Sequence, residues 1–106
     1  MRVTDLIKLQ EESGVYEIQR MIDDGSVWHM EGSMGRHAMS LLRSGECYLP
    51  EASHRDAYGN RIPSRSELAK GTRGTIENSI KYYKQKDKYD IEIEKTEKLF
   101  NALNKL

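Results

Sequence analysis

The chain has 106 residues, a length that builds one domain with a modest core. Charged residues make up 32% of it and hydrophobic residues 37%, which suits a small polar helical protein and leaves little apolar material for a large enclosed cavity. Its 17 basic and 17 acidic side chains cancel, which argues against a strongly cationic nucleic-acid binder and against an acidic mimic of DNA.

The apolar runs and the cysteine content bear on location. No apolar run approaches the ~20 residues that a membrane-spanning helix needs. Residues 1–9 carry charges at Arg2, Asp5 and Lys8 and lack the apolar core of a signal peptide. Cys47 is the only cysteine, so no intrachain disulfide can form. We therefore expect a protein of the reducing cytoplasm that makes no membrane contact.

Turn residues predict two helices and a tryptophan-containing turn at the start of the chain. Thr4 is placed to cap a first helix, which the Ser13-Gly14 pair ends. A second helix is expected from about Val15 to Asp23, before a turn signal at residues 23–26. Trp28, the only tryptophan, follows this turn, and we expect it to anchor the core.

A third helix is predicted to begin near Ser33, which is a favourable N-cap residue, and to end at Ser44-Gly45. Arg36 would stand in its first turn, where a cation is unfavourable with the helix dipole, so we expect an internal salt bridge there. A short extended stretch at residues 47–50 should follow. The helix has a buried stripe of Met34, Ala38, Leu41 and Leu42.

Residues 51–74 form a long polar loop whose turn residues predict an ordered conformation. Its aliphatic content is almost confined to Ile62 and Leu68, yet turns are expected at residues 58–60 and 63–64. Basic side chains concentrate here: residues 36–73 hold seven basic and four acidic side chains, whereas residues 1–31 hold three basic and seven acidic ones. Nearly all these cations are arginine, whose planar fork suits carboxylates and phosphates.

The loop is the predicted contact surface, because arginine and tyrosine are common interface anchors. We expect at least one guanidinium to face outward, and replacement of Arg61 and Arg65 by alanine to weaken binding at little cost in stability. The alternative is that the arginines pair with acidic side chains and only hold the fold. The candidate binding residues are Arg55, Tyr58, Asn60, Arg61, Arg65 and Arg73.

The turn before the last helix is a candidate anion site. Backbone N–H groups at a helix start, beside an arginine and two hydroxyls, can hold a phosphate or carboxylate. The alternative is a plain capped turn, with Thr75 as the N-cap. The candidate anion-binding residues are Gly71, Thr72, Gly74 and Thr75.

The last helical region is expected to extend into the lysine-rich end of the chain. Apolar residues at heptad-like spacing predict a packing or oligomerisation seam, formed by Tyr89, Ile93, Phe100 and Leu103. The sequence thus predicts a mainly α fold: a compact helical domain over residues 1–83, including the ordered polar loop 51–74, and a C-terminal amphipathic helical extension over residues 84–106.

The residues that could carry metal or nucleophilic chemistry lack the required spacing. His29, His37, Cys47 and His54 include no compact metal-binding pair. Cys47, His54 and Asp56 have the residue types of a nucleophile, a base and an orienting acid, but no nucleophile elbow or oxyanion loop accompanies them. We expect no catalytic residue, no metal and no cofactor.

Residues 27–75 resemble small uncharacterised accessory proteins of bacteriophages and prophages. The resemblance lies in five motifs: WHMEGSMGRHAM at 28–39, GECYL at 45–49, HRDAYGN at 54–60, PSR at 63–65 and GTRGT at 71–75. It implies an origin in a mobile element and assigns no catalytic residues.

Three function classes follow. By analogy with small phage proteins that block host proteins, including CRISPR nucleases, the leading expectation is a non-enzymatic protein of the host cytoplasm that binds and inhibits a host or defence protein. The second class is an anion binder that holds a nucleotide signal or a nucleic-acid backbone through the arginine-rich loop. The third is a structural or assembly protein that forms a homodimer or larger oligomer through the C-terminal helix.

Overall fold

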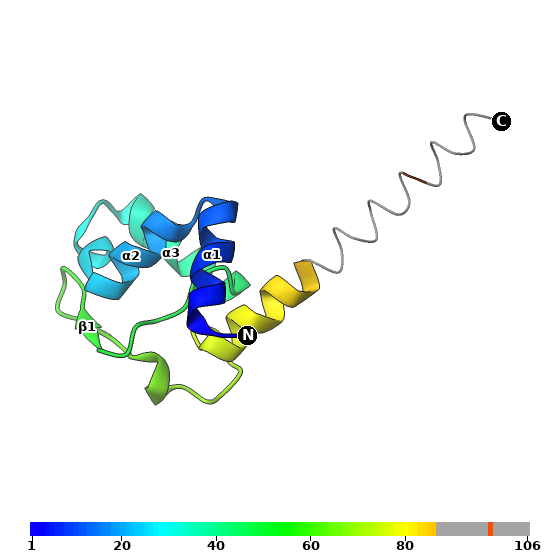
Figure 1. Cartoon of the computed structure of the whole chain (residues 1–106). Coiled ribbons are helices and arrows are strands. Elements are labelled where there is room, and N and C mark those ends of the chain that lie inside the picture. The colour runs from blue at the N-terminus through cyan, green and yellow to red at the C-terminus, as the bar shows by residue number, and fades with distance from the viewer. Residues whose placement is uncertain (87–97, 99–106) are drawn as a thin grey trace.

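The computed structural model describes residues 1–86 and residue 98 of the chain. The fold is mainly α, as the sequence predicts, with one small antiparallel hairpin (Figure 1). In chain order the elements are α1 (Val3–Ser13), α2 (Tyr16–Asp24), the 3-10 helix η1 (Ser26–His29), α3 (Gly32–Ser44), β1 (His54–Arg55), β2 (Arg61–Ile62), the 3-10 helix η2 (Arg65–Glu67) and a helix over residues 76–86.

The first two helices end at the predicted turns, and α2 begins after Val15 as predicted, whereas α1 begins earlier than expected. The cap of α1 is Arg2, whose backbone N–H donates to Asp5 Oδ2 over 2.8 Å, so the prediction that Thr4 is the cap is wrong. Left-handed glycines end both α1 and α2, at Gly14 and Gly25. Trp28 is 8% exposed and packs in the core, as predicted.

The third helix also confirms its predicted end. Glu31 is the residue before α3, and it makes no side-chain capping bond, so Ser33 lies inside the first turn and is not the N-cap. At the other end Gly45 has φ +100°, and a Cβ built there would lie 2.8 Å from Tyr82 Cβ. Glycine therefore both ends α3 and lets the helix of residues 76–86 approach it closely.

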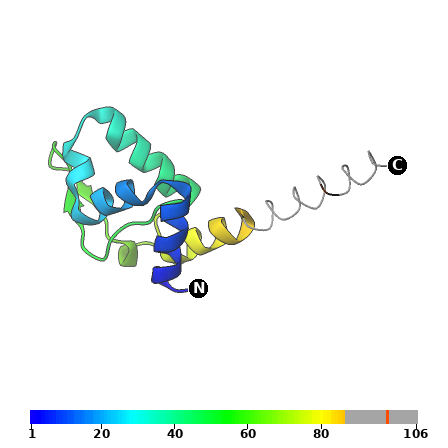
Figure 2. The same ribbon diagram turned by 45° about the horizontal axis from the view of Figure 1, so that its top comes forward.

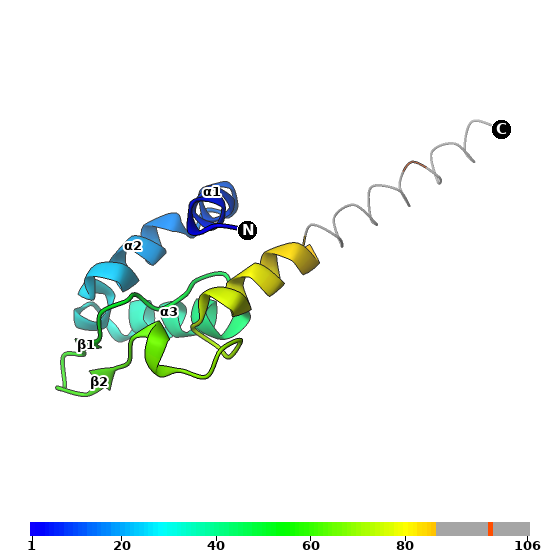
Figure 3. The ribbon, with the colours of Figure 1, turned by 60° about the horizontal axis from the view of Figure 1, so that its bottom comes forward.

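An extended segment at residues 46–49 runs from the end of α3 back toward β1 (Figure 3). The side-chain amide of Gln19, from α2, accepts from Tyr48 N (3.0 Å) and donates to Tyr48 O (2.9 Å). Gln10, from α1, donates to Gln19 Oε1 (2.8 Å) and to Glu46 O (3.1 Å). Two buried glutamines thus supply the hydrogen bonds that a neighbouring strand would normally give.

The helix of residues 76–86 completes the enclosure of this segment. Tyr83 Oη donates to Glu46 O over 2.8 Å, and Ser79 Oγ donates to Cys47 O over 3.4 Å. Leu6 of α1 packs in one apolar cluster with Tyr48 and Tyr83, so α1 lies against this helix (Figure 2). A second cluster joins α2, η1 and α3 around Trp28.

The polar loop is ordered, as predicted. The strands β1 and β2 pair His54 with Ile62 and Arg55 with Arg61. Backbone bonds tie the loop to residues 49 and 50: Leu49 N donates to Gly74 O (2.9 Å), and Arg65 N donates to Pro50 O (3.0 Å).

The predicted seam of Tyr89, Ile93, Phe100 and Leu103 lies outside the described residues, so it stays a prediction, as does the division of the chain at residues 83 and 84.

Candidate functional site

Two of the candidate arginines in the loop make internal ion pairs. Arg61 pairs with the Glu67 carboxylate. Arg65 Nη2 donates to Glu51 Oε1 (2.9 Å) and its Nη1 donates to Leu49 O (3.2 Å), which ties the loop to the extended segment. The pair with Arg61 and a hydrogen bond from the Ser64 N–H lower the pKa of Glu67 to about 2.

These pairs correct one expectation from the sequence. The side chain of Arg65 is only 21% exposed, and its guanidinium lies 5.8 Å from the centre of the Tyr48 ring. The expectation that its replacement costs little stability assumed an exposed side chain, and for Arg65 the structure contradicts this assumption. No local pattern marks this pair, because the acidic partner of Arg65, Glu51, is 14 residues away.

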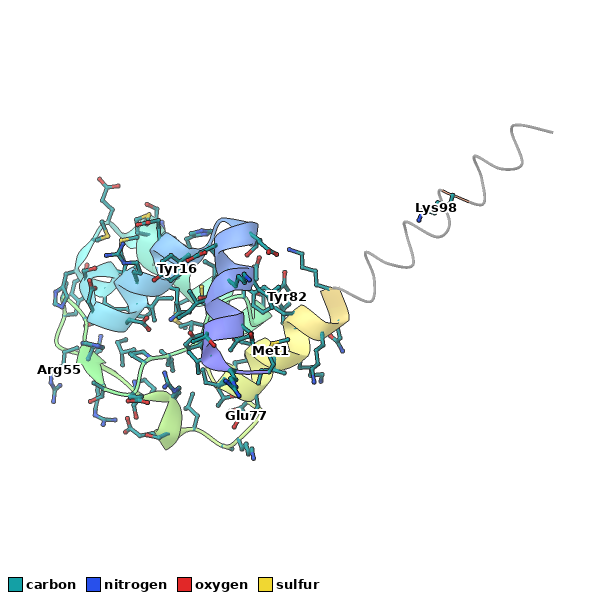
Figure 4. All side chains as sticks on the ribbon, viewed as in Figure 1. Met1, Tyr16, Arg55, Glu77, Tyr82 and Lys98 are labelled. Carbon is teal, nitrogen blue, oxygen red and sulfur yellow. The ribbon has the colours of Figure 1, made fainter. Side chains whose placement is uncertain are left out.

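The hairpin tip presents the other predicted loop residues outward. Asp56 Oδ1 accepts from the backbone N–H groups of Tyr58 (2.9 Å) and Asn60 (2.8 Å) and fixes the turn. Tyr58 is 91% exposed. Arg55 donates to Gly59 O (2.8 Å) and lies at the outer edge of the hairpin (Figure 4).

The turn at residues 71–75 has the geometry of the capped-turn alternative. Thr75 Oγ1 accepts from Asn78 N (3.3 Å) and donates to Thr72 O (2.6 Å), while the Thr72 hydroxyl donates to Ala69 O (2.5 Å). Gly74 is buried, and a Cβ built on it would lie 2.9 Å from a methyl carbon of Leu49. Both hydroxyls are therefore used inside the fold, and anion binding at this turn stays a prediction.

A hollow surface lies beside the loop, along α3. A groove of about 560 Å³ separates η1 and the first half of α3 from the hairpin tip. Its exposed apolar side chains are Met30, 49% exposed, and Met39, 39% exposed, in addition to Tyr58. The indole N–H of Trp28, which also lines the groove, is buried with no acceptor among the described residues.

Two helix glycines make room for the groove. Gly32 and Gly35 lie along its floor in the first turns of α3. A Cβ on Gly32 would lie 3.2 Å from Arg36 Nη1, so the guanidinium lies over this glycine, and a Cβ on Gly35 would meet nothing within 4 Å. The absence of side chains at these positions therefore leaves the groove open.

The groove continues toward the last turn of the loop. A neighbouring hollow of about 300 Å³ shares Met39, Arg43 and Ile62 with the first and extends to Leu49 and Arg73. We refer to the two hollows together as the α3 groove.

Three arginine side chains border the α3 groove. The guanidiniums of Arg36, Arg43 and Arg73 make no hydrogen bond or ion pair with any residue that the structure describes. The salt bridge expected for Arg36 is therefore not found within this part of the chain. The expected place of Arg36 in the first turn is also corrected, because α3 begins at Gly32 and Arg36 is its fifth residue.

Two acidic residues also line the groove. The Asp56 carboxylate is occupied by the hairpin: desolvation opposes its ionisation, but the hydrogen bonds from Asn60 and Tyr58 hold its pKa below the ordinary value. Glu31, at the start of α3, makes no ion pair within the described residues. Among the described residues, the three guanidiniums of Arg36, Arg43 and Arg73 outnumber the carboxylates of Glu31 and Asp56, so the lining of the groove carries a net positive charge.

The residues considered for catalysis and metal binding are dispersed. Among residues 1–86 and 98, no three histidine, cysteine or acidic side chains gather closely enough to hold a metal ion. Burial raises the pKa of the Cys47 thiol to about 12, so this cysteine is not a ready nucleophile. His54 Nε2 lies 3.1 Å from the backbone oxygen of Asp23, on α2.

Comparison with known proteins adds no relative. No family model, no curated protein and no solved structure matches this chain. Within the described part of the chain, no helix combines the length and the apolar character needed to cross a membrane.

Proposed function

We propose that this chain is a non-enzymatic binding protein that attaches to another protein through the α3 groove. The observation that carries the proposal is the groove itself, in which exposed Met30, Met39 and Tyr58 stand beside unpaired arginines. Methionine, tyrosine and arginine are enriched in protein interfaces, where apolar anchors are surrounded by polar side chains. Methionine also adapts its shape to an apolar partner surface.

This surface differs from the one that the sequence predicts but overlaps it. Tyr58 and Arg73 belong to both, whereas Arg61 and Arg65 are engaged in the fold. Arg55 and Asn60 lie at the hairpin tip beside Tyr58 and extend the contact surface at its rim.

The finer proposal is that the partner is a host or defence protein that this chain inhibits inside the host cell. It is supported by the resemblance of residues 27–75 to phage and prophage accessory proteins, because that segment includes Met30, Arg36, Met39, Arg43 and Tyr58. A binding protein without chemistry of its own inhibits by occupying a surface that its partner needs.

The test compares matched variants of the full chain. Met39→Glu places a charge in the groove, and Val3→Glu is its control, since Val3 is an equally exposed apolar residue on α1, at 41% against 39%. Each variant is immobilised, exposed to host lysate and checked by circular dichroism. The partner protein, identified by mass spectrometry and then purified, should bind wild type and Val3→Glu and lose binding to Met39→Glu.

One result would contradict the proposal. If the purified partner binds Met39→Glu and a Tyr58→Ala variant as tightly as wild type, the groove is not the contact surface. If nuclease treatment abolishes capture of the partner, and capture falls steeply as the salt concentration rises, the anion-binding class is supported instead.

A further inference from the structure

We propose that the segment held in the α3 groove is acidic, with carboxylate side chains on either side of an apolar anchor residue. This inference rests on the proposed function and names the chemistry of its partner. It follows from the order of side chains along the groove, from the charges that border it and from the apolar character of its lining.

The side chains of α3 set the spacing. Arg36, Met39 and Arg43 follow each other at intervals of three and four residues, so they lie on one face of the helix. A rise of 1.5 Å per residue separates the two arginines by about 10 Å along the axis. The groove therefore presents a guanidinium, an apolar thioether and a second guanidinium in a row.

The charges that border this row favour carboxylates over other groups. Arg36 and Arg43 have no acceptor among the described residues, and Arg73 continues the positive border into the second hollow. Each planar guanidinium can hold a carboxylate through two parallel hydrogen bonds. A basic segment would meet repulsion at all three positions, with only the carboxylates of Glu31 and Asp56 in compensation.

The lining favours a protein segment over a nucleic acid. Between the arginines the surface is formed by Met39, Ile62 and Trp28, which suit an aliphatic or aromatic side chain of a peptide. A nucleic-acid site would need a continuous cationic track for successive phosphates, whereas apolar side chains separate these arginines and Glu31 stands at the Arg36 end of the row.

The experiment selects random 16-residue peptides displayed on a surface against the full wild-type chain. We expect enrichment of peptides in which Asp or Glu flank Leu, Ile, Phe, Met or Trp. For the best peptide, the Arg36→Glu/Arg43→Glu double variant should weaken affinity by about tenfold or more, because it replaces attraction by repulsion. The Arg36→Lys/Arg43→Lys variant should lose less affinity than the glutamate variant, because it keeps the positive charges but not the paired hydrogen bonds of the guanidiniums.

A matched charge change controls for net charge. The double variant Lys8→Glu/Arg20→Glu makes the same change of net charge on α1 and α2, at exposed positions outside the groove. Its affinity for the peptide should stay within about twofold of the wild-type value.

Met39→Glu separates the two proposals. If it abolishes peptide binding while Arg36→Glu/Arg43→Glu does not, the groove binds protein but the acidic inference fails, and if neither matters, the proposed function fails as well.

Three further outcomes would overturn the inference. Enrichment of basic or uncharged peptides, or of none, would show that acidic segments are not the ligand. A 20-nucleotide single strand that displaces the peptide and binds with similar affinity would indicate a nucleic-acid site. Light scattering tests whether the wild-type chain associates with itself. If it does, and Met39→Glu removes the association, a second copy of the chain fills the groove.

Discussion

Single side chains hold the centre of this fold through hydrogen bonds to the backbone. Gln19 has both amide atoms engaged with Tyr48, and Gln10 joins it to Glu46, so a strand-like segment is satisfied without a sheet. A buried polar group that loses its partner keeps its desolvation penalty, so such side chains are sensitive positions.

Gln19→Leu should therefore destabilise the fold by about 2–4 kcal/mol, since it leaves the N–H and C=O of Tyr48 unpaired in the core. Chemical denaturation followed by circular dichroism measures this loss. The control is Gln85→Leu, an exposed position in the helix of residues 76–86, which should change stability by less than about 0.5 kcal/mol. Equal effects of the two substitutions would contradict the role of the amide.

Arg65→Ala should destabilise by about 1–2 kcal/mol, because its guanidinium bonds the Leu49 carbonyl and covers Tyr48, while the exposed Glu51 adds little. Arg55→Ala, at the exposed edge of the hairpin, should cost less than about 0.5 kcal/mol. The difference between their unfolding midpoints in denaturant tests this ranking, and reversal of the order would contradict it.

Acid should weaken the loop through Glu67. Folding lowers its pKa from the usual 4.5 to about 2, so the stability that its carboxylate gives is complete above pH 4.5 and is lost as the pH falls toward 2. Melting temperatures of wild type and Glu67→Gln should differ most above pH 4.5 and converge toward pH 2. A gap that stays constant over this range would show that the carboxylate is not stabilised by the fold.

At the scale of the element, two glycines of α3 have opposite roles. Gly35 lies inside the helix with nothing near its missing Cβ, whereas Gly45 is left-handed and in contact with Tyr82. Gly35→Ala should stabilise by about 0.5–1 kcal/mol, because alanine is the better helix former. Gly45→Ala should destabilise by about 1–2 kcal/mol from left-handed strain alone, with the clash in addition. Thermal unfolding of both variants should shift in opposite directions, and a common direction would contradict this assignment.

At the scale of the whole molecule, residues 46–49 connect the two apolar clusters. One cluster surrounds Trp28, the other surrounds Leu6 and Tyr83, and the Gln10–Gln19 pair and the extended segment join them. Disruption of either cluster exposes the segment that the other one needs, so the domain should unfold as one cooperative unit.

The chain ended after Lys86 should therefore fold and show one transition, with coincident near- and far-ultraviolet circular dichroism signals, because both clusters lie within residues 1–86. Two separate transitions would contradict this.

The same truncation tests the predicted seam of Tyr89, Ile93, Phe100 and Leu103. If the truncated chain has the stability and, by light scattering, the oligomeric mass of the full chain, the seam prediction is contradicted.

The sequence by itself determined the features that depend on neighbours a few residues apart. The ends of α1 and α3 at Gly14 and Gly45, the cap at Thr75 and the tight turn of the hairpin follow from local backbone preferences. Predictions for the first residue of a helix were weaker, at Thr4 and Ser33, because several nearby residues compete for the same role.

Only the tertiary structure decided which surfaces meet. Glu51 neutralises Arg65 from 14 residues away, and Gln19 bonds Tyr48 from 29 residues away, so no local pattern marks either pair. The α3 groove likewise needs the hairpin tip to stand opposite Arg36, Met39 and Arg43. Within residues 1–86 and 98, the guanidiniums of Arg36, Arg43 and Arg73 have no acidic partner. Which charges meet is decided by packing, which sequence periodicity does not encode.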